Sequence, residues 1–176
     1  MRKRLAVMCS GNGTNFENIV RSCKEHEVVL MLYNTKGCGA SRRATKLGIP
    51  SAYFHSSEED KMMSELTWAR VDYIILAGWM RILSEEFVNQ FPNRIINVHP
   101  SLLPKYKGMH AVEQAMRSGD KVTGCTVHYV NEELDGGEVI KQAEVPIFKT
   151  DTVEKLTKRI QQEEYRILPD VINKLP

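Results

Sequence analysis

The sequence predicts an α/β fold in which a parallel β-sheet carries helices on both faces and gains antiparallel strands in its C-terminal half. Short apolar runs alternate with amphipathic stretches as far as residue 99, which is typical of repeated strand–helix–strand units. Beyond that point, residues 122–130 and 138–148 alternate between apolar and polar. Asp135-Gly136-Gly137 between them has the composition of a turn, so the two segments are expected to pair antiparallel. We therefore expect a Rossmann-like sheet in one domain spanning residues 1–176.

Five short apolar runs bounded by turn residues are the expected strands of the parallel sheet. They span residues 5–9, 28–33, 51–54, 73–77 and 95–99. The stretches between them carry helix-forming residues. Helices are expected over 15–26, 41–47, 57–70 and 85–90. A long C-terminal helix is expected after Thr150-Asp151, because Glu154 follows Asp151 by three residues and completes a capping box.

Composition narrows the class of protein. Of the 176 residues, 42% are hydrophobic and 26% are charged, as in an ordinary globular domain, and the formal net charge is +2. Because the charge is small and no basic stripe accompanies it, a general affinity for nucleic acid is not expected. The longest apolar run, 73–80, is too short for a membrane-spanning helix, and no signal-peptide pattern follows the first residues. We therefore expect a cytoplasmic protein without a membrane partner.

Cysteines and isolated histidines give weaker signals. The four cysteines are scattered and form no C-x-x-C pair, so reduced, mostly buried thiols are expected rather than a zinc site or a disulfide framework. They are Cys9, Cys23, Cys38 and Cys125. Two histidines, His26 and His55, are expected at the surface.

The first chemistry-bearing segment is the loop Ser10–Asn15, which lies between a predicted strand and a predicted helix. Glycines let successive backbone N–H groups point at one anion, and the helix N-terminus adds a favourable dipole. The hydroxyls of Ser10 and Thr14 can complete such a phosphate site. The loop is not a dinucleotide fingerprint, because Phe16 stands at the third glycine position, and it lacks the Gly-Lys-Ser/Thr of a P-loop. A purely structural turn stays open as the alternative.

The second segment places Asn97 and His99 on the same face of a predicted strand, because residues two apart project to the same side. Ile96 and Val98 face the other side, toward a core. Pro100 ends the strand, so the pair lies at its carboxyl end, where open α/β sheets bind ligands. A shared, exposed strand end favours function over a purely structural histidine.

The third segment is Asn131–Gly137, where two glycines after Asp135 allow a sharp turn that directs one carboxylate inward. A carboxylate beside a histidine stabilises its protonated form and fixes its tautomer. Composition alone favours the simpler interpretation of a solvated acidic hairpin.

Four segments taken together resemble the phosphoribosylglycinamide formyltransferases, a family of folate-dependent enzymes of purine synthesis. In chain order they are SGNGTN, LAGWMRIL, INVHPSLLPKYKG and ELDGG, and the resemblance runs from Leu5 to about Pro169. HPSLLP is common to folate formyltransferases and hydrolases, whereas SGNGTN in a short chain is similar to this family in particular. The resemblance implies formyl transfer from 10-formyltetrahydrofolate to the amine of glycinamide ribonucleotide, without a metal. The implied products are formyl-glycinamide ribonucleotide and tetrahydrofolate.

The resemblance also implies residue roles. Asn97, His99 and Asp135 match the catalytic trio, and Glu164 matches the residue that holds the substrate ribose hydroxyls. The substrate phosphate is implied to bind at Gly11, Asn12, Gly13, Thr14 and Asn15. The folate is implied to bind at three places. The pterin is read by strand-end backbone at Arg81, Ile82 and Leu83, and its apolar walls are Leu76, Phe87 and Val88. The third place is the loop from Val130 to Asp135, which includes Asn131, Glu132, Glu133 and Leu134.

The chemistry of the trio agrees with these roles. The amine attacks the formyl carbon, and a protonated His99 and the Asn97 amide are suitable donors to the oxygen that becomes negative. Asp135 can keep His99 protonated and help a water remove the proton from the attacking nitrogen. His128 shares its strand face with Thr126 and Val130 and is expected to support the trio, with simple packing as the alternative. His110, in the loop after SLLPKYKG, is a weaker supporting candidate.

One segment departs from the family. The segment 54–72 is several residues shorter than is usual in the family. Family members often have an arginine in this segment, near the substrate phosphate. Here the run is Ser56-Ser57-Glu58-Glu59-Asp60, and Lys61 is the candidate substitute. Trp79 stands where Phe is common, and we expect it to be tolerated.

Three rival functions remain to be separated from this one. Methionyl-tRNA formyltransferase is expected to carry an additional C-terminal tRNA-binding domain, and formyltetrahydrofolate hydrolase an additional N-terminal regulatory domain. A non-catalytic nucleotide-binding module using only the glycine loop leaves the trio without a role. The expected partners are small-molecule substrates, with the chain a monomer or a homodimer.

Overall fold

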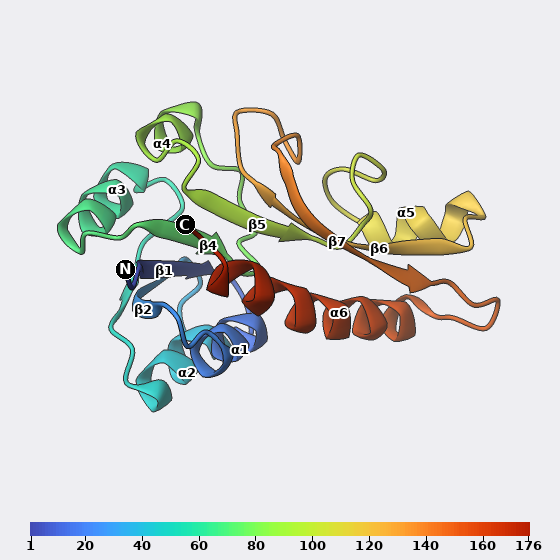
Figure 1. Ribbon diagram of the computed structural model, residues 1–176, viewed down its shortest axis with the longest axis horizontal. Coiled ribbons are helices and arrows are strands. Elements are labelled where there is room, and N and C mark those ends of the chain that lie inside the picture. Colours follow the sequence, from blue (N-terminus) through green and yellow to red (C-terminus); the bar gives the residue numbers. More distant parts are fainter.

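The computed structural model describes all 176 residues, and its centre is a seven-stranded sheet (Figure 1). The strands in chain order are β1 (Arg4–Cys9), β2 (Glu27–Tyr33), β3 (Ser51–Tyr53), β4 (Tyr73–Leu76), β5 (Ile95–His99), β6 (Val122–Tyr129) and β7 (Val139–Pro146). Their spatial order is β3-β2-β1-β4-β5-β6-β7. Pairs from β3 to β5 are parallel, whereas β5 with β6 and β6 with β7 are antiparallel. The predicted fold class is therefore confirmed.

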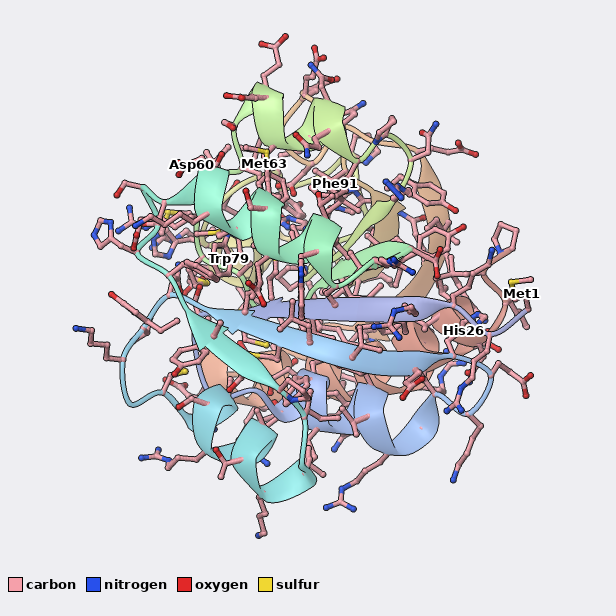
Figure 2. All side chains as sticks on the ribbon, turned by 90° about the vertical axis from the view of Figure 1, so that its left-hand side faces the viewer. Met1, His26, Asp60, Met63, Trp79 and Phe91 are labelled. Atoms are coloured by element: carbon pink, nitrogen blue, oxygen red, sulfur yellow. The ribbon has the colours of Figure 1, made fainter.

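Six helices cover the two faces of the sheet. They are α1 (Thr14–Ser22), α2 (Gly39–Leu47), α3 (Glu59–Trp68), α4 (Glu85–Gln90), α5 (Ala111–Ser118) and α6 (Val153–Asn173). Helices α1, α2, α5 and α6 contribute to one apolar cluster, and α3 and α4 contribute to a second cluster on the opposite face. Figure 2 shows α3 on one side of the strands and α1 and α2 on the other. No helix is long and apolar enough to cross a membrane.

The central strand β1 shows why the sequence forms this layered core. Leu5, Val7 and Cys9 belong to the first cluster, while Ala6 and Met8 belong to the second. Because both faces of a parallel strand are covered by helices, its residues form a continuous apolar run rather than an alternating one. All four cysteines are buried, as expected.

Most expected elements are present, with different ends. The first helix ends at Ser22 rather than at residue 26, and the third begins at Glu59. The C-terminal helix is capped by Thr152, whose hydroxyl accepts the Lys155 N–H at 3.2 Å. The predicted cap at Asp151 is wrong, because that carboxylate accepts the Phe148 N–H and pairs with Arg159 instead.

Helix α5 was not expected from the sequence. Its N-cap is His110, which lies in the left-handed region with φ 59° and makes no side-chain capping bond. The usual start signal of a Ser, Thr, Asp or Asn is therefore absent. Only the stop signal is readable, since Gly119 ends the helix with φ 79°.

The prediction that His26 lies at the surface is wrong. His26 is buried near the N-terminus (Figure 2), and its Nδ1 accepts the Lys3 N–H at 3.2 Å. A single backbone contact of this kind leaves no pattern in the sequence. His55 is exposed, as expected.

Candidate active site

The predicted trio comes together at the carboxyl end of β5. Asn97 and His99 lie on one face of that strand, opposite Ile96, which belongs to the core. Asp135 comes from the loop between β6 and β7, and its Oδ2 lies 3.5 Å from Nδ1 of His99. Both side chains are largely buried, with 8% exposed. The geometry expected from strand alternation and the glycine turn is thus present.

Backbone geometry holds the Asp135 carboxylate in place. Asp135 has φ 51°, in the left-handed region that L-residues rarely adopt. Its Oδ2 accepts the Gly108 N–H at 2.7 Å, which ties the β6–β7 loop to the loop that follows His99. A Cβ on Gly137 would lie 1.6 Å from the Tyr129 carbonyl oxygen, so that position requires glycine. The carboxylate is therefore directed inward rather than into solvent.

The hydrogen bonds of His99 define the roles of its two ring nitrogens. Nε2 lies 2.8 Å from the carbonyl oxygen of Tyr106. Because a carbonyl oxygen only accepts, Nε2 carries a hydrogen. Nδ1 is left facing Asp135, and a second proton there creates an imidazolium beside a carboxylate. His99 can therefore donate from its Nδ1 edge, with Asp135 as the stabilising anion.

His128 orients the Asn97 amide. The antiparallel register pairs Asn97 with His128, and Nδ2 of Asn97 lies 3.3 Å from Nε2 of His128. Nδ1 of His128 lies 3.0 Å from its neighbouring carbonyl oxygen, that of Tyr129, so Nδ1 is the protonated nitrogen and Nε2 is an acceptor. Burial lowers the pKa of His128, which favours this neutral form. One amide hydrogen of Asn97 is thereby anchored, and the other is available to a ligand.

The other supporting candidate, His110, is not brought to the trio. Its side chain is 71% exposed and its nearest ionic partner is Glu113, at 3.8 Å. One contact at the site could not be predicted from the sequence, namely that between His99 Nε2 and the Tyr106 carbonyl oxygen. Tyr106 lies in the left-handed region, with φ 55°. No residue type signals such a backbone geometry in advance.

The glycine loop before α1 leaves a run of backbone N–H groups without partners. The N–H groups of Asn12, Gly13, Thr14, Asn15 and Phe16 have no hydrogen-bond acceptor within the protein. Gly13 has φ 76°, and a Cβ there would lie 2.6 Å from the Cα of Ala40. The Asn15 Oδ1 is buried without a partner. Free donors at a helix N-terminus are the arrangement that anions bind.

Helix α6 contacts this loop through Tyr165, the residue that follows Glu164. The hydroxyl of Tyr165 donates to Thr14 Oγ1 at 2.8 Å, and Asn18 on α1 donates to the Tyr165 carbonyl at 2.9 Å. Glu164 is only 9% exposed, and burial raises the pKa of its carboxyl to about 7. A buried carboxylate without a hydrogen-bond donor is costly, so a ligand hydroxyl that donates to it is favoured.

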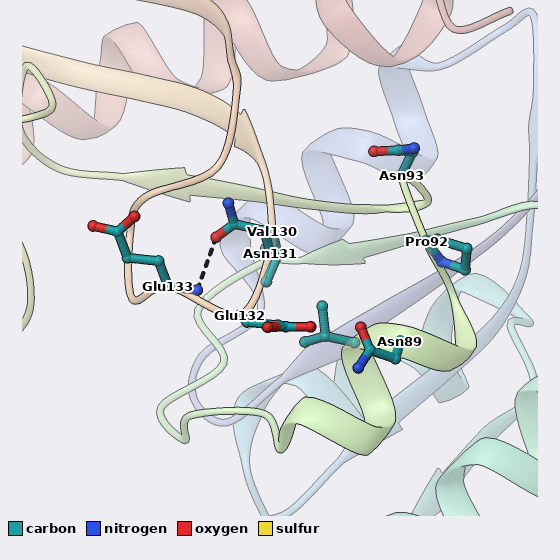
Figure 3. Close-up of a pocket in the computed structure, with 8 residues that line it drawn as sticks. Asn89, Pro92, Asn93, Val130, Asn131, Glu132 and Glu133 are labelled. Carbon is teal, nitrogen blue, oxygen red and sulfur yellow. Dashed lines mark hydrogen bonds between the residues drawn. The ribbon is translucent and has the colours of Figure 1, made fainter.

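The predicted folate side contains a hollow of about 340 Å³ between α4 and the β6–β7 loop (Figure 3). Its lining includes the predicted residues Val88, Val130, Asn131, Glu132 and Glu133. The Asn131 side chain accepts the Glu133 N–H at 2.9 Å, which shapes the loop (Figure 3). Sequence reasoning missed three lining residues at the end of α4, namely Asn89, Pro92 and Asn93.

The remaining predicted folate residues divide into core and rim. Phe87 is fully buried in the cluster of α3 and α4, so it supports the wall from behind. Leu76 is also buried in that cluster, and Leu83 packs against it. Ile82 is exposed in the loop after β4, beside Arg81. None of these residues lines the hollow, whose hydrophobic lining residues are Val88 and Val130.

Lys61, the candidate phosphate contact in the shortened segment, is occupied elsewhere. Its Nζ lies 2.6 Å from Glu58 Oε2, and both side chains are partly or largely exposed. The hydrogen bond from Lys61 lowers the pKa of Glu58. The structure therefore shows Lys61 and Glu58 as a local surface ion pair. Trp79, in the loop after β4, packs against the cluster of α3 and α4.

The chain thus combines a mixed α/β sheet with an Asn–His–Asp trio at a strand end and a glycine loop whose backbone N–H groups are free. Residues 3–172 match the formyl transferase family, and the chain belongs to that family. It is 39% identical over 181 residues to phosphoribosylglycinamide formyltransferase of Haemophilus influenzae, covering 97% of this chain and 85% of that protein.

Two further relatives extend the comparison. The chain is 42% identical over 181 residues to trifunctional purine biosynthetic protein adenosine-3 of Drosophila melanogaster; the match covers 96% of this chain but only 13% of that protein. In structure, it resembles glycinamide ribonucleotide transformylase 1 from Geobacillus kaustophilus, with a TM-score of 0.94, 38% identity and 98% of each chain covered.

Proposed function

We propose that this chain transfers the formyl group of 10-formyltetrahydrofolate to the amine of glycinamide ribonucleotide, as a step of purine synthesis. The products are formyl-glycinamide ribonucleotide and tetrahydrofolate. The observation that carries the proposal is the His99 Nδ1 edge facing Asp135, beside an Asn97 amide anchored by His128. Family membership and the names of the relatives support the same reaction.

The reaction exchanges one carbon–nitrogen bond for another. The amine nitrogen forms a bond to the formyl carbon and loses a proton, while the bond from that carbon to the folate nitrogen breaks. The folate nitrogen gains a proton, so the overall exchange needs no oxidant or reductant. The protein must therefore stabilise charge on the formyl oxygen and move protons between the two nitrogens.

Asn97 and His99 stabilise the developing charge. In this proposal the free hydrogen of the Asn97 amide and a proton on His99 Nδ1 are both donated to the formyl oxygen. Because the two donors are held by His128 and the Tyr106 carbonyl, they need little reorganisation as the charge forms. Removing one donor of this kind costs about 10²–10³ in turnover.

Asp135 has two tasks in this proposal. Its Oδ2 stabilises the His99 imidazolium, and its carboxylate accepts a proton from the attacking amine through a water. The Gly108 N–H that binds Oδ2 holds the carboxylate in place for both tasks.

The nucleotide substrate is proposed to bind between the glycine loop and α6. Its phosphate accepts hydrogen bonds from the free N–H groups of residues 12–16, and its ribose hydroxyls donate to Glu164. The folate is proposed to lie along the hollow beside α4, with its ring against Val88 and Val130. This arrangement brings an amine from one side and a formyl carbon from the other to the trio.

The proposal also covers the domain organisation, location, partners and oligomeric state of the chain. We propose a single catalytic domain over residues 1–176 that works in the cytoplasm on small molecules, as a monomer or homodimer, without nucleic acid or metal.

A spectroscopic assay tests the function. Purified protein is mixed with 10-formyltetrahydrofolate and glycinamide ribonucleotide, and the absorbance change of the deformylated folate is followed. Turnover is expected only when the nucleotide is present, and the His99→Ala variant serves as the inactive control. Deformylation at the same rate without an amine would instead indicate a hydrolase. Nucleotide binding without any deformylation would indicate a non-catalytic binding module.

A further inference from the structure

Three carbonyl groups of the glycine loop, those of Gly11, Asn12 and Gly13, are hydrogen-bonded within the protein. The Gly11 carbonyl accepts the Ala40 N–H at 3.0 Å, and the Gly13 carbonyl accepts the Glu17 N–H at 2.9 Å. The Asn12 carbonyl accepts from a side chain, Nε of Arg43, at 2.8 Å. The bond to the Asn12 carbonyl is thus the only one of the three whose donor is a side chain, so a substitution of Arg43 can remove it.

Arg43 joins three parts of the structure through one guanidinium. While Nε binds the Asn12 carbonyl, Nη1 lies 2.7 Å from Glu17 Oε2 on α1. The Arg43 side chain is partly buried, with 29% exposed. A planar guanidinium fixes both partners with its rigid set of donors, which an ammonium cannot reproduce.

The bond to the Asn12 carbonyl fixes the direction of the Gly13 N–H. In a trans peptide, the carbonyl of one residue and the N–H of the next point in opposite directions. Holding the Asn12 carbonyl toward α2 therefore holds the Gly13 N–H toward the anion side. A charged donor on the carbonyl also polarises the peptide, which strengthens its N–H as a donor.

This peptide needs an external restraint because its own residue gives none. Gly13 must be glycine, since it has φ 76° and a Cβ would meet Ala40 at 2.6 Å. Glycine leaves the peptide plane free to rotate, and that freedom is lost when a phosphate binds. A loop fixed before binding avoids part of this cost.

We propose that Arg43 is the positioning residue of the substrate-phosphate site, acting through the Asn12–Gly13 peptide rather than by contact with the phosphate. The proposal rests on the proposed function. It assigns to α2 the arginine contribution that the shortened 54–72 segment lacks, since Lys61 is paired with Glu58.

The chain offers a matched control at the adjacent position. Arg42 is exposed and forms no hydrogen bond or ion pair, so Arg42→Met removes the same charge near the loop without releasing the peptide. Glu17→Gln removes the ion pair but leaves the Arg43–Asn12 bond, which separates the two contacts of the guanidinium.

Steady-state kinetics provide the first test. Arg43→Met is expected to raise the KM for the nucleotide by about tenfold, while kcat and the folate KM stay within about twofold. Arg42→Met and Glu17→Gln are expected to resemble the wild type, and Arg43→Lys to fall between. With the dephosphorylated nucleoside, Arg43→Met is expected to change nothing. An equal loss for nucleotide and nucleoside, or the same loss in Arg42→Met, overturns the proposal.

Calorimetry with ribose 5-phosphate tests the inference without catalysis. The wild type is expected to bind this probe about tenfold more tightly than Arg43→Met, with equal melting temperatures showing that both are folded. If the wild type binds the probe but transfers no formyl group, the proposed reaction fails while the role of Arg43 stands. Equal binding by the two proteins, or no binding by the wild type, overturns the inference.

Discussion

The Nε2–H of His99 donates to the carbonyl oxygen of Tyr106 at 2.8 Å, which leaves Nδ1 as the only ring nitrogen available to the reaction. Nδ1 faces Asp135 at 3.5 Å, a separation longer than a good hydrogen bond. A proton on Nδ1 can therefore be shared with a substrate oxygen without displacing the carboxylate. For this reason the proposed mechanism uses His99 as the donor and Asp135 as its counter-ion.

His99→Ala is the most direct test of that assignment. The substitution is expected to lower kcat by about 10²–10³ with little change in either KM, because the lost interaction is strongest in the transition state. His110→Ala removes an exposed histidine from the same region and is expected to leave kcat unchanged. Steady-state kinetics on both variants decide the question; a kcat for His99→Ala within a few-fold of wild type contradicts the mechanism.

His128 is expected to act mainly through Asn97, because its Nε2 lies 3.3 Å from the Asn97 amide nitrogen and 3.9 Å from Asp135 Oδ1. His128→Phe removes the acceptor for the Asn97 amide while keeping an aromatic ring, and kcat is expected to fall about tenfold, or about 1.4 kcal/mol. In an Asn97→Ala background, the same substitution is expected to add little, because the interaction is already lost. A double-mutant cycle in kcat measures this coupling. Full additivity of the two effects would contradict a role of His128 through Asn97.

Lys61→Ala is expected to leave the nucleotide KM unchanged. The Lys61 ammonium is held by Glu58 at 2.6 Å on an exposed helix end, and exposed pairs of this kind contribute little. The KM values of Lys61→Ala and wild type, measured side by side, test this. A rise comparable to that of Arg43→Met would return Lys61 to the phosphate site.

Glu164 is expected to make stability depend on pH. Burial raises its pKa from 4.5 to about 7, so its carboxyl adds stability when protonated and loses that contribution as pH rises through 7. By linkage, this shift lowers the free energy of unfolding by about 3 kcal/mol above pH 7, relative to its value below pH 4.5. Glu164→Gln cannot ionise. Its melting temperature, relative to wild type, is therefore expected to be higher at about pH 8 than at about pH 5.

A neighbouring residue supplies the control for this prediction. Glu163 pairs with Arg166 on the exposed side of α6, so Glu163→Gln is expected to show no comparable trend. Melting curves of the three proteins at both pH values decide it. A constant difference between Glu164→Gln and wild type contradicts the buried, unpaired carboxyl.

The sequence was most informative where local periodicity decides the structure. Alternation along residues 95–99 placed Asn97 and His99 on one face, and the glycines after Asp135 indicated the inward carboxylate; both are present. Helix α5 was missed because His110 starts it without a capping side chain. The cap of α6 was misplaced because Asp151 and Thr152 are both good caps, and only the pairing of Asp151 with Arg159 separates them.

Contacts between distant segments account for the rest. The Tyr106 carbonyl on His99 and the Arg43 side chain on the Asn12 carbonyl depend on tertiary geometry, for which neither residue type is diagnostic. The register of β5 against β6 places His128 opposite Asn97, which strand alternation alone cannot predict.

Tracing the formyl carbon tests the central claim most directly. 10-Formyltetrahydrofolate with an isotopically labelled formyl carbon is incubated with the protein and either glycinamide ribonucleotide or its dephosphorylated nucleoside, and the products are separated by mass spectrometry. The label is expected in the amide of the formylated nucleotide, with kcat/KM for the nucleoside lower by at least about 100-fold because the glycine loop has no phosphate to bind. Label recovered as formate, or equal kcat/KM values for nucleotide and nucleoside, would contradict the account.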